Sequence, residues 1–409
     1  MLKLNSIPTN VFLADDIQDT ELKTNSSSIS RKDIVSTGRL VACEYFGRKL
    51  KGYEPKTNGL QDKDGKEISL ADLDKAHKEK KLLFCATMAN KAVGKEAPTS
   101  IKDIDASYAK DKTFVSTMAA IDKDVLDPLF FAILDDVGMG LMQWTPASLG
   151  STTEIEIKSN DAFFFEDSSW GSGRSTSKNY LYAQSVFVTP EMYSCNATIK
   201  WYQDIVNGEA GRYYAAIMSG MWNKIYAILI ANLKQAVSNG YIPAGLTAAT
   251  YTTPNYITIT DKVAAANGVR VDELVAIGTR SALSNLLPVD GQGGAIVGLQ
   301  YGLGEKWTTN GFLPNVAGVD ALAISPVIVP GTQNNELLTI DTGNDIFILA
   351  KGGYAPMRGV YAEGSPITLT ATPSDTADFT IDINVGAMFK IVPLFASKVG
   401  KITSVYPNA

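Results

Sequence analysis

The sequence predicts an α+β fold with one long helix, an exposed hairpin and a mixed sheet. Residues 209–239 carry apolar side chains at spacings of three and four, the pattern of an amphipathic helix. At a rise of ~1.5 Å per residue this helix is about 45 Å long. Residues 153–158 (TEIEIK) alternate apolar and charged side chains, as a half-exposed strand does. Residues 256–395 mix strand-like and helix-like segments without a regular βαβ series.

Composition indicates a folded protein whose charge is unevenly distributed. The 409 residues are 45% hydrophobic and carry a net charge of −6, which excludes a disordered chain and a general nucleic-acid-binding signature. Residues 1–130 hold 41 charged side chains, whereas residues 131–409 hold only 39. Two interpretations remain open for the second stretch: burial against other subunits, or a polar surface without charge. The most apolar window, Tyr213–Leu233, contains Lys224 and is not a convincing membrane span.

The cysteines predict neither a disulfide framework nor a zinc site. Cys43, Cys85 and Cys195 are odd in number, far apart and form no CxxC pair, which favours a reducing compartment. No apolar run of signal-peptide length begins the sequence. We therefore interpret the glycosylation motifs at Asn25 and Asn196 as chance matches.

The first third of the chain is predicted to hold an arm, short segments and a charged helix. Residues 1–30 have the composition of an arm, and glycines divide residues 31–66 into short pieces. Residues 69–82 predict a helix with Ser69 as its N-cap. The lysines within residues 78–81 suit the C-terminal end of that helix.

Two more helices and a hairpin follow. Residues 99–112 and 120–142 have helical patterns, the second despite a proline at position 128. Residues 151–189 predict an extended hairpin that returns as a strand over residues 180–188. The segment 168–179 is polar and glycine-rich, as expected of a hairpin tip.

The last 170 residues predict alternating strands and helices. Asn239–Gly240 is a good stop for the long helix. Residues 257–266 are predicted to run from a strand into a helix, and Leu274–Gly278 is predicted to be a strand before a short helix. Further strands are predicted within residues 320–330, 345–350, 366–371 and 377–395.

The sequence predicts no catalytic, cofactor or metal site. His77 is the only histidine and lies in a charged helix, so we expect a solvated surface residue. A chain with one histidine cannot build a multi-histidine metal site, and it contains no GxSxG or GxxxxGK[ST] motif. The acid pairs lie on charged or amphipathic helices, where we expect solvated faces and helix caps: Asp103/Asp105, Asp122/Asp124 and Asp135/Asp136.

The order of these elements resembles the major capsid proteins of tailed bacteriophages and herpesviruses, which share the Hong Kong 97 fold. Residues 151–189 resemble the extended arm (E-loop) of that family, residues 197–239 its peripheral domain with the spine helix, and residues 256–330 its axial domain. The resemblance implies four regions: a charged N-terminal region over 1–130, the arm and peripheral domain over 131–255, the axial domain over 256–375, and a return to the peripheral domain over 376–409.

The resemblance also implies a function and partners. The chain would be a non-enzymatic subunit of an icosahedral shell enclosing double-stranded DNA, built of hexamers and pentamers in the host cytoplasm and carried in the virion. Scaffold and portal proteins, and decoration proteins in some members, would be its partners, with no cofactor and no membrane. The expected inter-subunit contacts are Phe163, Phe164, Phe165, Trp170, Arg174 and Lys178. The expected basic lining of the shell is Arg31, Lys32, Arg48, Lys49 and Lys51.

Three rival functions remain. An encapsulin-type compartment shares the fold, but its shell protein needs less than the charged N-terminal third seen here. A phage tail or baseplate protein would form rings or tubes. A hydrolase with a carboxylate or serine mechanism would need a pocket with perturbed acids.

Overall fold

The computed structural model describes most of the chain and divides it into two compact units. The described residues are 14, 17–23, 28–48, 50, 53, 60–61, 67–138, 142–148, 151–158, 183–287, 306, 308–324, 327–328, 337–338, 344–351, 356–363, 367–375, 379–394 and 398–403. Unit 1 comprises Met1–Val137, Glu191–Lys224 and Ala362–Phe389. Unit 2 comprises Gly138–Pro190, Ile225–Tyr361 and Lys390–Ala409.

Unit 1 begins with two short hairpins and a helix that the sequence did not predict. Strands β1 (Glu21–Lys23) and β2 (Ser28–Ser30) pair, as do β3 (Leu60–Gln61) and β4 (Glu67–Ile68). Helix α1 covers Arg31–Phe46, where short segments were expected, so that prediction is wrong. The glycine read as a break, Gly38, is a packing glycine, because a Cβ there would lie 2.7 Å from His77 Cε1.

Helix α2 (Leu70–Val93) begins as predicted and ends eleven residues later than predicted. The Ser69 hydroxyl accepts a hydrogen bond from the backbone N–H of Asp72 at 3.1 Å, which confirms the N-cap. The lysines within residues 78–81 lie in mid-helix, because apolar residues continue the helical period beyond them. Gly94, at φ 71°, ends the helix instead.

Of the next two predicted helices, the first is wrong and the second is confirmed. Residues 99–112 form two 3₁₀ turns, Ile101–Asp103 and Ala106–Lys110, in place of one helix. Helix α3 (Lys112–Gly138) confirms the helix expected over 120–142, starts earlier, and contains Pro128.

The sheet of unit 1 is built on the long strand β18 (Thr380–Pro393). Strand β17 (Ile367–Thr372) and strand β8 (Glu191–Lys200) both pair with it in antiparallel register. Phe389 of β18 packs against Phe130 of α3, with ring centroids 6.1 Å apart. This aromatic contact places α3 on the sheet.

Unit 2 contains a six-stranded mixed sheet, which confirms the predicted α+β class. Its order is β11 (Asn315–Val316), β12 (Val319–Ile324), β10 (Leu274–Thr279), β15 (Asp345–Ala350), β19 (Gly400–Thr403) and β9 (Thr247–Ala248). The β10–β12 and β19–β9 pairs are parallel, and the others are antiparallel. Residues 346–350 of β15 are all buried, as a central strand requires.

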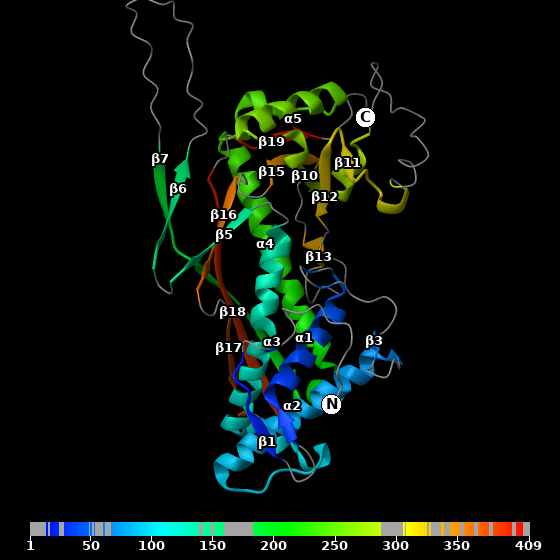
Figure 1. The fold of residues 1–409 in the computed structure, drawn as a ribbon, viewed down its shortest axis with the longest axis vertical. Helices are drawn as coiled ribbons and strands as arrows, with labels where there is room; N and C mark the ends of the chain where they lie inside the picture. The colour runs from blue at the N-terminus through cyan, green and yellow to red at the C-terminus, as the bar shows by residue number, and fades with distance from the viewer. Residues whose placement is uncertain are drawn as a thin grey trace, which may run out of the picture. The chain divides into compact units, whose positions relative to one another are not determined.

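Helix α5 packs beside β15 and β19 and corrects another prediction (Figure 1). It covers Thr253–Asn267, so residues 257–266 include no strand. The β-branched run ITIT favours a strand by composition. However, Tyr256, Ile259 and Val263 are all buried, and their spacings of three and four are helical. The short helix α6 (Arg280–Ser284) follows β10 as expected.

The long helix and the base of the hairpin are confirmed, whereas the predicted tip, residues 168–179, and residues 180–182 of the returning strand lie outside the described residues. Helix α4 covers Ala210–Ser238 and ends at Gly240, which has φ 67°. Strands β6 (Thr153–Lys158) and β7 (Ala183–Val188) pair antiparallel and lie side by side in Figure 1.

The remaining strands of unit 2 extend the sheet of β18 and form one separate pair. Strand β16 (Met357–Ala362) lies in strand order between β5 (Met142–Ala147) and β18, and residues 390–393 of β18 belong to unit 2. The short strands β13 (Val327–Ile328) and β14 (Leu337–Leu338) form a separate pair.

We predict that Gly38→Ala destabilises unit 1 and that Gly220→Ala does not. An alanine Cβ at position 38 would lie 2.8 Å from Val125 as well as against His77, and overpacking of this kind costs about 1–3 kcal/mol. Gly220 lies on α4 with open space around it, so alanine there should add about 0.5–1 kcal/mol of stability. Urea unfolding of both variants measures the difference. Equal stability of the two variants would contradict the close packing of α1.

Candidate functional site

The base of the β6–β7 hairpin is fixed by a small apolar cluster in unit 2. Ile155 of β6 and Val188 of β7 are buried together with Ala147 of β5 and Val360 of β16. Because successive side chains of a strand point to opposite faces, Phe187, which precedes Val188, lies on the other face and is 65% exposed. Among the described strands, β6 and β7 pair only with each other. The described part of the hairpin is therefore anchored at its base by this cluster.

The second candidate feature is the edge of the unit 1 sheet. Strand β8 pairs with β18 along ten residues, Glu191 to Lys200. No other described strand pairs with β8, so its opposite edge is open within the part of the chain that the structure describes. Residues 194–196 at its centre are exposed, and Met192 is 57% exposed.

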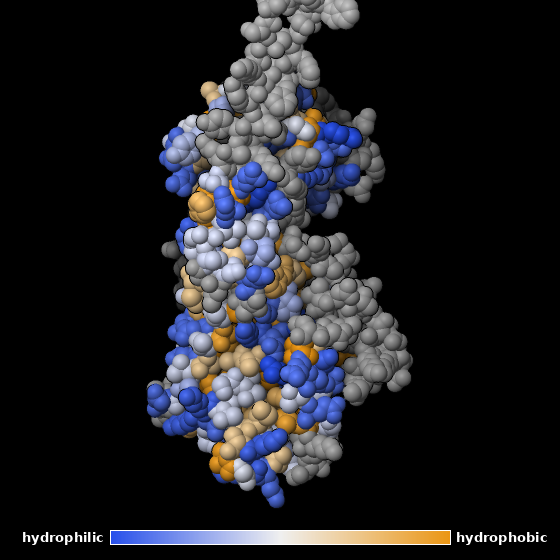
Figure 2. Space-filling model, turned by 60° about the vertical axis from the view of Figure 1, so that its left-hand side comes forward, coloured by the Kyte–Doolittle hydropathy of each residue, from blue (hydrophilic) through white to orange (hydrophobic). Residues whose placement is uncertain are grey.

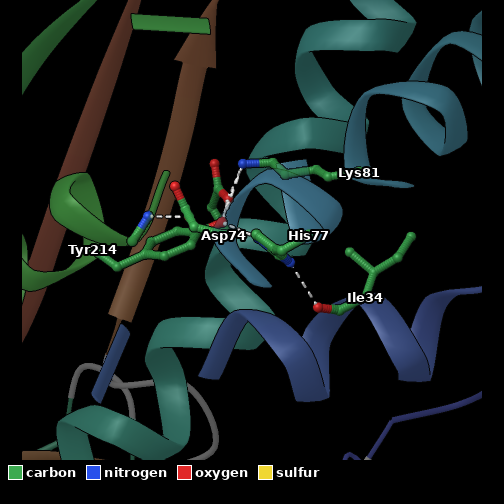
Figure 3. Close-up of polar contacts among 7 residues, drawn as sticks. Ile34, Asp74, His77, Lys81 and Tyr214 are labelled. Carbon is green, nitrogen blue, oxygen red and sulfur yellow. Dashed lines mark hydrogen bonds and ion pairs between the residues drawn. The ribbon is translucent and has the colours of Figure 1, made fainter. Parts of the chain in front are cut away.

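The third feature is a buried polar cluster that joins three helices of unit 1 (Figure 3). Lys81 of α2 donates to Asp122 of α3 and, at 3.1 Å, to the hydroxyl of Tyr214 of α4. The Tyr214 hydroxyl donates to the same oxygen of Asp122. Asp122 is 1% exposed and Lys81 8% exposed, so the pair is buried. We call Asp74, His77, Lys81, Asp122 and Tyr214 the polar centre.

His77 completes the polar centre from the buried side of α2. Its Nδ1 lies 3.1 Å from the carbonyl oxygen of Ile34 on α1, and its Nε2 lies 3.4 Å from the Tyr214 hydroxyl. The side chain is fully buried, so the predicted surface histidine is wrong. Burial, with the neighbouring Lys81 charge, lowers the pKa of His77 to about 3. The imidazole is therefore neutral at physiological pH.

Asp74 ties the start of α4 to α2. Its Oδ1 accepts a hydrogen bond from the backbone N–H of Gly211 at 2.8 Å. Burial raises the pKa of this carboxyl, while the hydrogen bond from the Gly211 N–H opposes the shift. A carboxylate here satisfies an N–H that has no partner within the helix and favours the positive end of the helix dipole.

A cavity of about 610 Å³ lies beside the polar centre within unit 1. Asp122, Tyr213 and Tyr214 line it together with residues 197–199 of β8. Asp122 Oδ2 and the Tyr213 hydroxyl have no hydrogen-bond partner in the described residues. On another wall, Lys78 Nζ donates to the carbonyl oxygens of Val206 and Gly208, at 2.8 and 2.9 Å. These bonds hold the end of the π-helix η4 (Trp201–Val206).

The polar centre is arranged for holding helices together. Its lysine, tyrosine and histidine each contact a group on another helix. In the described residues, the carboxyls whose pKa is raised, as a hydrolase would need, are Asp74 and Asp127; burial raises the pKa of Asp127 to about 6. Neither is among the residues that line the cavity. In the described residues no group of three or more His, Cys, Asp or Glu is placed to hold a metal ion.

The other acid pairs are mostly as expected. Asp103 accepts backbone and hydroxyl hydrogen bonds from Thr99 and Ser100, and Asp105 caps a 3₁₀ turn by accepting from the Ser107 N–H. Asp122 is the exception, because it is buried where a solvated face was expected. The side chains of Asp135 and Asp136 lie outside the described residues.

Exposed apolar side chains are scattered over both units. On the face drawn in Figure 2, the apolar patches are small and lie among polar side chains. The large exposed apolar residues are Val93, Phe131, Phe187, Met192, Tyr202, Val206, Tyr241 and Ile257. None of the described helices is long and apolar enough to cross a membrane.

The predicted contact residues are not tested by the structure. All six lie outside the described residues: Phe163, Phe164, Phe165, Trp170, Arg174 and Lys178.

Two of the basic residues expected to line a shell contact other side chains within unit 1. Arg31 forms an ion pair with Asp124, and the Arg48 guanidinium lies 5.3 Å from the ring centroid of Trp222. Lys49 and Lys51 are not described.

Sequence reasoning missed the polar centre although a signal was present. Leu73, His77 and Lys81 recur every four residues, and all three are buried. Position 77 therefore continues the apolar stripe of α2, and a period count that included polar residues would have placed it inside.

Comparison with known proteins returns structures but no sequence relatives. No family model and no curated protein matches the chain. The mature capsid of bacteriophage PhiM1 is 12% identical, with a TM-score of 0.41 over 64% of this chain and 85% of that chain. The capsid of cyanophage P-SCSP1u is 10% identical, with a TM-score of 0.41 over 64% and 86%.

The matched structures also include a protein compartment. The SrpI encapsulin complex from Synechococcus elongatus is 11% identical, with a TM-score of 0.38 over 65% of this chain and 86% of that chain.

We predict that Lys81→Met destabilises unit 1 by about 3–5 kcal/mol, because Asp122 would keep a buried charge without its partner. Replacing both residues, as Lys81→Met with Asp122→Leu, should recover much of that loss. Chemical denaturation of the single and double variants measures it. A double variant as unstable as the sum of the two single variants would rule out an energetic coupling of the pair.

We predict that His77 makes the protein less stable in mild acid. The pKa of His77 is lowered in the folded state, so between pH 6.5 and about 3 the unfolded chain binds a proton that the folded chain does not. Stability therefore falls as the pH falls through this window, by up to about 1.4 kcal/mol per pH unit. Asp127 acts in the opposite direction, since its pKa is raised to about 6.

Comparison with a His77→Gln variant isolates the histidine from the carboxyl groups. Unfolding free energies at pH 7, 6 and 5 should show a steeper decline for the parent protein than for the variant. Parallel curves would mean that the pKa of His77 is the same in the folded and the unfolded chain.

Proposed function

We propose that this chain is the structural subunit of an icosahedral virus shell that encloses double-stranded DNA. The observation that carries the proposal is the β6–β7 arm, which is anchored at its base by Ile155 and Val188 and presents Phe187 outward. Ordering an extended arm costs conformational entropy, and contact area on a neighbouring subunit offsets that cost. A long smooth helix and an open sheet edge supply further surfaces for neighbours.

The distribution of charge supports the same function. A subunit of a closed shell buries several different surfaces against its neighbours, so each surface must exclude unpaired charge. Residues 131–409 carry only 39 charged side chains, fewer per residue than an isolated domain usually keeps on its surface. Burial in an assembly accounts for this scarcity.

The four regions read from the sequence are part of the proposal. Residues 1–130 form the N-terminal region, 131–255 the arm and peripheral domain, 256–375 the axial domain, and 376–409 the return to the peripheral domain. Four strands of the six-stranded sheet, β10, β11, β12 and β15, lie within residues 256–375 and support an axial domain there, while β9 and β19 join this sheet from the two neighbouring regions. Strand β8, helix α4 and strand β18 then belong to the peripheral domain.

The partners follow from the shell. Copies of the chain form hexamers and pentamers, scaffold and portal proteins take part in assembly, and decoration proteins bind some shells of this kind. Assembly takes place in the host cytoplasm and the product is the virion. The role is structural and not enzymatic, and the polar centre supports this because its charged groups bond to one another across helices.

Electron microscopy of the purified protein over a range of concentrations and salt strengths tests the proposal. We expect closed polyhedral shells, or hexameric and pentameric rings, with scaffold protein supplied if the chain alone does not assemble. Tubes or stacked rings would favour a tail protein, and shells filled with protein cargo would favour a compartment. Monomers under every condition, with scaffold present, would overturn the proposal.

In the same assay we expect Trp170→Ala to lower the yield of shells several-fold without changing the unfolding of the subunit. An aromatic residue near an arm tip is typical of an interface anchor, and truncating such anchors costs about 2 kcal/mol or more. Phe131→Ala, on a partly exposed site of α3, is the matched control and should leave the yield unchanged. Normal yields from the Trp170 variant would remove this residue from the interface.

A further inference from the structure

Few side chains of the π-helix η4 (Trp201–Val206) are buried in unit 1. Trp201 and Ile205 are buried, whereas the other residues of η4 are exposed. Tyr202 is 61% exposed and Val206 is 46% exposed, so the outward face of the segment gains little from packing. π-Helical turns are rare and occur frequently at functional sites. A segment with so few buried contacts opens more readily than the core beside it.

Two cavities of unit 1 adjoin η4. The cavity of about 610 Å³ beside the polar centre is lined by residues 203–205 among others. A second cavity, of about 150 Å³, is lined by Trp201, Ile205 and Val206 together with residues of α2. Leu82 of α2 and Ile205 of η4 line both. Because close packing is interrupted at two places along the segment, η4 can move with the loss of few contacts.

Lys78 of α2 fastens the end of η4 that leads into α4. Its Nζ donates to the carbonyl oxygens of Val206 and Gly208, at 2.8 and 2.9 Å. These hydrogen bonds are charge-assisted, which makes them stronger than bonds between neutral groups. One turn earlier on α2, Asp74 accepts a hydrogen bond from the Gly211 N–H at the start of α4, at 2.8 Å. Helix α2 therefore holds both sides of the junction between η4 and α4.

The opposite end of η4 is fixed without Lys78. Trp201 is 2% exposed, and its ring centroid lies 5.9 Å from that of Phe114 on α3. The backbone N–H of Lys200, the last residue of β8, donates to Asp204 Oδ2 at 2.8 Å. These contacts tie the beginning of η4 to β8 and α3, so a movement of the segment turns about its Trp201 end.

We propose that residues 202–208 form a flap that opens and closes over the larger cavity, with Trp201 as its fixed end and Lys78 as its latch. The structure shows the closed state, in which Lys78 binds the two carbonyl oxygens and Ile205 is buried. Gly208 allows the flap to close tightly, because a Cβ at this position would lie 2.4 Å from the carbonyl oxygen of Asp204.

The open state is stabilised by different contacts. Asp122 and Tyr213 line the cavity, and Asp122 Oδ2 and the Tyr213 hydroxyl have no hydrogen-bond partner in the described residues. Burying a polar group without a hydrogen bond is costly, so the entry of water on opening favours these two groups. That gain opposes the loss of the Lys78 hydrogen bonds and of the burial of Ile205. The latch therefore decides how often the flap is open.

Hydrogen exchange of the full-length, unassembled chain, followed by mass spectrometry, tests the latch. Lys78→Met removes both hydrogen bonds to the flap and keeps the apolar part of the side chain. We expect the amides of residues 202–208 to exchange at least about tenfold faster than in the parent protein, while the amides of α3 exchange as before. An unchanged rate in the flap, or an equal acceleration in α3, would overturn the proposal.

Lys75 provides the matched control. It lies three residues earlier on α2 and is exposed, and no hydrogen bond joins its side chain to the flap in the described residues. Lys75→Met removes the same charge from the same helix and should leave exchange in residues 202–208 unchanged. Equal acceleration by the two variants would show that the charge of α2, and not the latch, keeps the segment closed.

A thiol inside the cavity measures the opening directly. Met118 of α3 lines the larger cavity and is 2% exposed. Val115, one turn earlier on α3, is 1% exposed and is not among the lining residues. Alkylation of Met118→Cys therefore reports movement of the flap, and alkylation of Val115→Cys reports loosening of α3 itself.

Both cysteine variants are made in a Cys195→Ala background, because Cys195 is exposed whereas Cys43 and Cys85 are buried. We expect Lys78→Met to speed the alkylation of Met118→Cys at least about fivefold and to leave that of Val115→Cys unchanged. Equal acceleration at both positions would indicate general loosening and reject the flap, as would no acceleration at position 118.

The flap and the shell can fail separately, because both measurements use the unassembled chain. Faster exchange in Lys78→Met without any shells would support the flap and reject the shell. Shells from a chain whose flap exchanges equally fast with and without Lys78 would support the shell and reject the flap.

Discussion

The buried pair of Lys81 and Asp122 is the constraint on which the helical core of unit 1 depends. Taking two charges out of water is costly, and the cost is recovered only when each charge has a partner and its remaining hydrogen bonds are made. Lys81 finds its partners in Asp122 and Tyr214, which come 41 and 133 residues later in the chain, whereas Asp122 Oδ2 has no hydrogen-bond partner in the described residues. The pair can therefore be satisfied only when α2, α3 and α4 have their native arrangement.

Other buried polar groups extend this constraint. Arg39 of α1 is 1% exposed, and its guanidinium donates to the carbonyl oxygen of Asp124 on α3 at 2.9 Å. His77 joins α2 to α1 through the carbonyl of Ile34, and burial keeps its imidazole neutral. The charge-dense first third of the sequence is thus partly an interior. Its lysines and aspartates specify which helices meet, a selectivity that apolar contacts alone do not supply.

The sequence predicted elements wherever one local pattern decided the outcome. The period of α4, the alternation of β6 and the caps at Ser69 and Gly240 are local signals, and the structure confirms each. Helix α1 was missed because Gly38 reads as a break, although its reason is the close approach of His77. Helix α5 was misread because β-branched composition was given more weight than the helical spacing of its buried residues.

The site was harder to predict because its members are distant in sequence. Nothing local to His77 shows that Ile34 and Tyr214 will cover it, so a charged helix appeared to be solvated on all sides. The predicted contact residues were hard to choose for a different reason: their partners lie in another copy of the chain. Trp170 and its neighbours were chosen for a surface that only a second copy can define, and a single chain does not contain that information.

The contrast between the two kinds of surface explains how one chain can be both a stable subunit and a building block. Inside unit 1, charges are paired and buried, which makes the fold specific. On β8, charge is removed from the whole centre of an exposed edge and kept only at Glu191 and Lys200. A lysine in mid-strand would protect such an edge and would also prevent another strand from pairing with it. Where each contact between subunits is weak, a misplaced subunit can dissociate, and only the simultaneous contacts of a closed assembly hold it in place.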